Sequence, residues 1–217
     1  MHSFCGSSES TDLEAAADAT SIRTNRCELV GRSALAGAAA IGALSLLGQR
    51  AGSAGAAPSA AQDRKIFNFA LLLEYLQAGF YSDAVDRGRL KGEVREFAEI
   101  VAGHERDHVQ FLQEALGPSA RKRPRFDFRD ATQHQRKFLS TAVVLENTGV
   151  AAYNGQVANL TKKGLAAAAE IVSVEGRHAA WISDLAGEDP APRAADPGAS
   201  AGAVVAIIRQ TGFLNVT

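Results

Sequence analysis

Four glutamates, each in the middle of an otherwise apolar helical face, constrain the fold of this chain more than any other feature of its sequence. Steps of three and four residues, which follow one face of a helix, trace four such faces. Two of the faces also carry a histidine three residues after the glutamate. In chain order, these central residues are Glu74, Glu105 with His108, Glu146, and Glu175 with His178.

Buried carboxylates on these faces need positive partners. An ionised carboxylate in a protein core is costly unless it is paired or bound to a metal. The four faces contain two imidazoles but no lysine or arginine, and two divalent ions would balance four carboxylates. Because oxygen and imidazole ligands suit iron, manganese and other intermediate divalent ions, the pattern predicts a buried dinuclear metal site.

The apolar spacing predicts an all-α protein made of two helical hairpins. Helices are expected over 66–85, 93–116, 131–161 and 165–186, separated by breaks that contain glycine or proline. The two glutamates of the first hairpin are 31 residues apart and those of the second are 29 apart. This matched spacing indicates two similar hairpins that place their ligands at one height.

Four segments carry a resemblance to the ferritin-like family of di-iron and di-manganese proteins. They read LLLEYLQAGFY (71–81), GHERDHVQFL (103–112), VVLENTGVAAY (143–153) and SVEGRHAAW (173–181). In such bundles two helices each supply a glutamate and two supply Glu-x-x-His. The chain resembles the exported bacterial members related to desiccation-associated proteins. The resemblance implies an antiparallel four-helix bundle over 62–186, with a long connection between its second and third helices.

The resemblance also implies how the six residues would hold two Fe or two Mn ions. The single glutamates of the first and third helices would bind, one or both bridging the metals. The glutamates of the Glu-x-x-His motifs would chelate or bridge, and each histidine would cap one metal. In that order the residues are Glu74 and Glu146, Glu105 and Glu175, and His108 and His178.

Two tyrosines share the faces of the single glutamates. Tyr81 and Tyr153 each follow a single glutamate by seven residues, as a tyrosine does in ferritins. They are therefore candidates to hydrogen-bond the centre or to donate electrons to it. An equally open interpretation is that both are core tyrosines with satisfied hydroxyls.

A zinc-hydrolase motif overlaps the predicted ligands. Residues 104–108 read H-E-R-D-H, so that His104 and His108 would bind zinc and Glu105 would act as general base. The charged pair between them is unusual for such enzymes, and Met1 is the only methionine, so no Met-turn is possible. This interpretation also leaves the other glutamates unexplained, and His104 is expected to lie behind the ligands or at the surface.

Residues 1–61 resemble an export leader. Arginines precede an uncharged run at 34–48, and small residues follow, with candidate cleavage sites at residues 54–56 and 59–61. The run resembles a twin-arginine (Tat) signal, although Asn25 and Glu28 depart from that motif; a Sec signal and an uncleaved anchor are the alternatives. We expect an exported protein, located in the periplasm, in the cell envelope or outside the cell.

The charge balance of the chain limits the kinds of binding partner that we expect. With 23 Lys+Arg against 24 Asp+Glu the chain carries a net charge of −1, which gives no electrostatic reason to expect nucleic-acid binding. The basic run at 121–125 is expected to be a solvated loop, and the mature chain is expected to have no membrane span. Residues 187–217 are predicted to be a linker and tail with a short helix, so a monomer or homodimer is expected.

These observations favour an oxidoreductase whose small-molecule substrates are O2, H2O2 or Fe(II), acting as a ferroxidase or in peroxide removal under stress. The alternative is a non-enzymatic metal-binding protein that protects the cell during drying. The zinc hydrolase is a third interpretation.

Overall fold

The computed structural model describes residues 57–214, which are helical apart from connections and one isolated bridge between Phe126 and Leu214. The predicted leader therefore lies almost entirely outside the described residues, including the arginines, the apolar run and the candidate site at 54–56. The elements are α2 (Ala60–Arg87), α3 (Gly92–Leu116), η1 (Gly117–Ser119), α4 (Gln135–Gln156), η2 (Val157–Asn159), α5 (Lys162–Leu185) and α6 (Ala201–Thr211).

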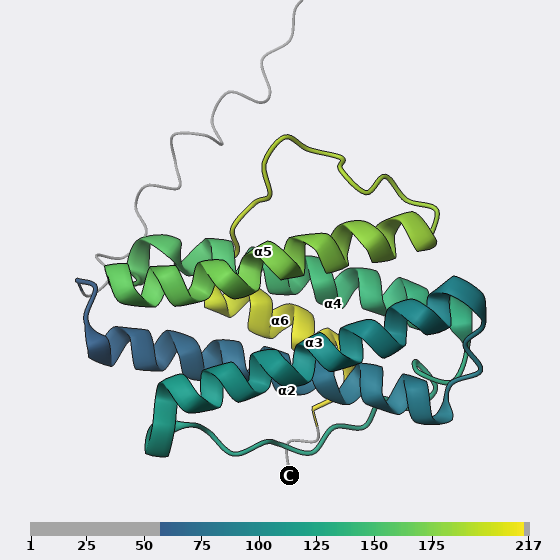
Figure 1. Cartoon of the computed structure of the whole chain (residues 1–217), viewed down its shortest axis with the longest axis horizontal. Helices are drawn as coiled ribbons and strands as arrows, with labels where there is room; N and C mark the ends of the chain where they lie inside the picture. The colour runs from purple at the N-terminus through teal and green to yellow at the C-terminus, as the bar shows by residue number, and fades with distance from the viewer. Residues whose placement is uncertain (1–56, 215–217) are drawn as a thin grey trace, which may run out of the picture. The chain divides into compact units, whose positions relative to one another are not determined.

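The first four long helices form a bundle of two antiparallel hairpins, α2–α3 and α4–α5 (Figure 1). The connection between α3 and α4 runs back along the bundle, so that α4 starts near the end of the bundle at which α2 finishes (Figure 1). Helix α2 also contacts α4, α3 contacts α5, and α6 packs against α4. The predicted all-α bundle with a long second connection is confirmed. Within residues 57–214, no helix has the length and apolar character needed to cross a membrane.

Three of the helices begin at hydroxyl caps that fix where each helix starts. Ser59, Thr161 and Ser200 each accept a backbone hydrogen bond from the first turn of α2, α5 and α6. The carboxylate of Asp63 in α2 accepts from the backbone N–H of Thr161 at 2.9 Å. This bond ties the first turn of α2 to the start of α5.

Helix α4 is shorter than the sequence predicts. The apolar spacing predicts a helix over 131–161, whereas α4 begins at Gln135 and ends at Gln156. The N–H of Ala131 donates to the carbonyl of Phe128 and closes a turn before the helix. The Phe128 side chain is buried in the core. Residues up to this turn therefore belong to the connection, and the helix begins only after it.

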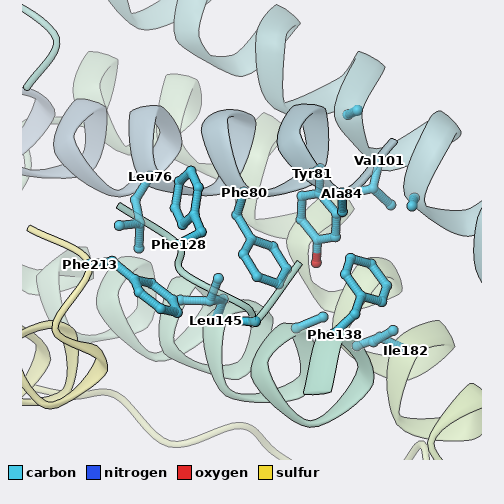
Figure 2. Close-up of a cluster of buried hydrophobic side chains, with 14 of the residues drawn as sticks. Leu76, Phe80, Tyr81, Ala84, Val101, Phe128, Phe138, Leu145, Ile182 and Phe213 are labelled. Atoms are coloured by element: carbon cyan, nitrogen blue, oxygen red, sulfur yellow. The ribbon is translucent and has the colours of Figure 1, made fainter. Parts of the chain in front are cut away.

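An aromatic cluster forms the larger part of the core. Figure 2 shows Phe80 among Phe128, Phe138 and Phe213, and its ring stacks on Phe138 with centroids 5.3 Å apart. Phe213 follows α6, and Val204 of α6 is fully buried against the same cluster. The segment after residue 186 therefore contributes to the core of the bundle.

A second apolar cluster lies on the other side of the predicted ligands. It contains Leu71 of α2, Leu112 of α3 and Ile171 of α5. Along α3 and α5 the glutamate separates residues of this cluster from residues of the aromatic cluster. The predicted metal level is thus a polar layer between two apolar ones.

Candidate metal centre

The structure brings the six predicted ligands together at the middle of the bundle. Each single glutamate comes from α2 or α4, and each Glu-x-x-His pair comes from α3 or α5. The four glutamates are at most 1% exposed, whereas His108 and His178 are 9% and 3% exposed. The helical period accounts for this convergence, because residues three and four apart share one face.

Within residues 57–214, these ligands form two groups, each able to hold one ion. The His108 position consists of Glu74, Glu105, His108 and Glu175, and the His178 position consists of Glu105, Glu146, Glu175 and His178. In each group the four ligand atoms lie within 4.8 Å of one another. Glu105 and Glu175 belong to both groups, so they are placed to bridge two ions.

At the His108 position, one imidazole nitrogen faces three carboxylates. His108 Nδ1 lies 3.4 Å from Glu74 Oε2, 3.6 Å from Glu105 Oε2 and 3.3 Å from Glu175 Oε1. Ligand atoms that each bind one tetrahedral ion at about 2.1 Å lie about 3.4 Å from one another. The observed separations therefore have the span that a single ion imposes.

The His178 position repeats this arrangement. His178 Nδ1 lies 3.2 Å from Glu105 Oε1, 3.4 Å from Glu146 Oε2 and 3.9 Å from Glu175 Oε1. The two imidazoles thus use the same ring nitrogen towards the same kind of carboxylate group.

Unpaired buried atoms show that the residues fit metal ions. Among the described residues, seven buried side-chain nitrogen and oxygen atoms lack a hydrogen-bond partner, and all belong to the six ligands. Buried polar atoms without partners are rare, because each one costs the free energy of its lost hydration. The atoms are Glu74 Oε2, Glu105 Oε1 and Oε2, His108 Nδ1, Glu146 Oε2, Glu175 Oε1 and His178 Nδ1.

Each tyrosine donates a hydrogen bond across the bundle to one of the single glutamates, at the carboxylate oxygen that faces away from the centre. The Tyr81 hydroxyl of α2 donates to Glu146 Oε1 of α4 at 2.5 Å, and the Tyr153 hydroxyl of α4 donates to Glu74 Oε1 of α2 at 2.6 Å. One oxygen of each glutamate is therefore fixed, and the other faces the centre.

Gln77 is a residue of the site that the sequence analysis missed. Its amide donates to Glu146 Oε1 at 3.1 Å and to Glu175 Oε2 at 3.4 Å, and the side chain is 2% exposed. The available signal was its position three residues after Glu74, which places a polar side chain on the buried face. Gly149 makes room beside it, because a Cβ there would lie 2.5 Å from Glu175 Oε2.

His104 contacts a ligand but lies outside both ligand groups. Its Nδ1 is 2.9 Å from Nε2 of His178, and the two rings meet edge to edge with centroids 5.2 Å apart and planes 11° apart. The described residues therefore do not gather His104 and His108 around one ion, as the zinc-hydrolase interpretation requires.

Burial and mutual repulsion shift the protonation of the cluster. Burial raises the pKa of Glu105 and Glu175 well above the usual range, and the neighbouring carboxylates add to this effect. The pKa of Glu74 is lowered overall: burial favours its protonated form, but its contacts with His108 outweigh the effect of burial. For His108, burial favours the neutral form, whereas contacts with three glutamates raise its pKa to about 12. The metal-free cluster therefore retains protons that a divalent ion would displace.

The fold and the site together define a class of protein: a four-helix bundle with a carboxylate–histidine centre made by facing helices. The chain matches the family model described as a ferritin-like domain over residues 62–188, and it belongs to the ferritin-like family. A search of the curated proteins finds no match to it.

Proposed function

We propose that this protein binds two iron or two manganese ions at the six residues and reacts with O2 or H2O2, as a ferroxidase or a peroxide-removing enzyme. What carries the proposal is the set of seven unpaired buried atoms, which divides into two groups that share two glutamates. When bound there, such ions would supply one-electron redox chemistry to a small oxidant.

The chain itself would hold the centre in place and shield it on two sides. Tyr81 and Tyr153 fix one oxygen of each single glutamate. Burial and the adjacent carboxylates raise the pKa of both phenols well above the usual range. The phenols therefore keep their protons and remain donors, while the two apolar clusters exclude water from either side of the centre.

A surface cavity gives small molecules a route to the centre. The cavity measures about 460 Å³ and opens between α3 and α5. Both ligand histidines line it, together with His104, Asp107 and Trp181 among others. Ions, O2 and H2O2 are small enough to reach the ligands by this route.

Metal content is the first test. Full-length protein is loaded anaerobically with Fe(II), Mn(II) and Zn(II) in competition, and about two iron or manganese ions per chain are expected. Glu146→Gln and His178→Ala should each lower the content, whereas Glu170→Gln on the exposed side of α5 should not. Consumption of O2 during Fe(II) oxidation, or of H2O2, is then measured on the loaded protein.

The outcomes separate the candidate functions. Two bound ions with no turnover would favour the non-enzymatic, protective metal-binding protein. A single zinc ion that depends on His104 but not on Glu146 would favour hydrolysis. Failure to bind any ion would refute the metal centre itself.

We also propose that the protein works after export, in a role related to stress, like the desiccation-associated proteins it resembles. The support is the leader-like composition of residues 1–61. Recovery of a shortened chain from the periplasm or medium of a bacterial host would test this. Full-length chain found only in the cytoplasm would contradict it.

A further inference from the structure

The two ligand positions differ in the residues that hydrogen-bond their ligands. At the His178 position, Tyr81 and Gln77 donate to its glutamates, and His104 contacts the histidine itself. The His108 position receives the Tyr153 bond, and it shares Glu175 with its neighbour. Among the described residues, none makes a hydrogen bond to Nε2 of His108.

The hydrogen bond to His178 bears directly on how its ring could bind a metal. An imidazole that binds through Nδ1 carries its proton on Nε2, and a partner for that proton fixes the tautomer and the ring orientation. His178 Nδ1 faces the carboxylates. His178 Nε2 lies 2.9 Å from His104 Nδ1, which can accept a hydrogen bond from it. The two ring planes lie only 11° apart, as a hydrogen bond in the plane of both rings requires, and this further restricts the orientation of His178.

The internal similarity of the hairpins identifies the matching residue at the other position. His104 immediately precedes Glu105, and the residue that immediately precedes Glu175 is Val174. Val174 lines the same cavity as His108, but its side chain offers no hydrogen-bonding group. On the cavity wall, the two positions therefore differ by a histidine-to-valine exchange.

We propose that His104 is a positioning residue that holds His178 as the Nε2–H tautomer and so makes the His178 position the tighter of the two. This inference rests on the proposed dinuclear centre and assigns an order to its filling. Loss of a hydrogen-bonding partner behind a ligand lowers metal affinity by about 10–100-fold. The first ion should therefore enter the His178 position, and the second the His108 position.

Zinc titration of the full-length protein tests the order, because zinc is redox-inert and diamagnetic. Calorimetry with a competing chelator should show two binding steps in the unmodified protein. His104→Ala should weaken the tighter step by about 10–100-fold and leave the other unchanged. His104→Asn, which keeps an acceptor near the place of Nδ1, should restore much of the loss. Val174→His should instead tighten the weaker step, and His134→Ala, an exposed histidine before α4, is the control.

Nitrogen-15 NMR of the zinc-loaded protein provides a readout that a merely structural role would not move. The His178 ring should carry its proton on Nε2, and this proton should exchange with water faster in His104→Ala. His104→Leu, which fills space without accepting a hydrogen bond, serves if the alanine variant is poorly folded. Equal steps in the unmodified protein, or His104 variants that behave like the His134 control, would overturn the inference while leaving the centre intact. No zinc binding by the unmodified protein would refute the proposed function instead.

Discussion

Replacing Gly149 with alanine should damage the metal centre while sparing the fold. The added Cβ would lie 2.5 Å from Glu175 Oε2, whereas ordinary contact begins at 3.4 Å, so Oε2 must move by about 0.9 Å and displace the carboxylate that also carries the ligand oxygen Oε1. Ligand positions in metal sites tolerate about 0.2 Å. Because Glu175 belongs to both ligand groups, we expect both affinities to fall, by about 10–100-fold.

The stability of the metal-free variant should move the other way. Alanine is favoured over glycine inside a helix by about 1 kcal/mol, and the atom that must move is the end of a flexible side chain. Thermal unfolding with a chelator present should therefore show an unchanged or raised midpoint. Gly176→Ala in α5 is the matched control, because its Cβ would meet nothing within 4 Å. Two tightly bound ions in Gly149→Ala would refute the role assigned to this close approach.

Three further predictions concern the tyrosines, the protons and the leader. Tyr81→Phe should weaken metal binding by about 10–100-fold, measured by titration against a chelator, because Glu146 Oε1 loses its 2.5 Å bond. Since the pKa values of Glu105 and Glu175 are raised in the folded chain above the ordinary value of 4.5, the metal-free protein should lose stability as the pH rises above 4.5. Denaturant titrations with a chelator check this, and a metal-free stability that rises with pH would contradict it. If a leader is removed, we expect cleavage after residue 56 and not after residue 61, because Ser59 caps α2; intact mass identifies the site.

The sequence predicted that the six buried residues would converge, because the helical period sets which residues share a face. Glu105 and His108 are one turn apart on α3, so a correct face brings both inward. Matched spacing within the hairpins then aligned the glutamates at one level. The structure adds that Glu105 and Glu175 belong to both groups, a fact that depends on how the hairpins face each other.

Contacts between distant segments were outside the reach of such patterns. His104 and His178 are 74 residues apart, and no periodicity in either helix indicates that their rings meet. The start of α4 was placed too early for a similar reason, because the burial of Phe128 is a tertiary contact. Sequence patterns also did not reveal that Phe213 would join the aromatic core around Phe80.

The crossed tyrosine bonds have a consequence for how such a bundle can arise. The tyrosine of each hairpin donates a hydrogen bond to the glutamate of the other hairpin. Reciprocal contacts of this kind are found between the subunits of a two-fold dimer. Gln77 and Gly149 are equivalent in the two halves, each three residues after its glutamate, and they meet: a Cβ on Gly149 would lie 3.5 Å from the Gln77 amide. Two identical halves would place two glutamines or two glycines there, and so either crowd the spot or leave a void. A large residue can face a small one at this place only if the two halves differ in sequence. Two halves joined in a single chain can differ in this way, whereas two identical subunits cannot.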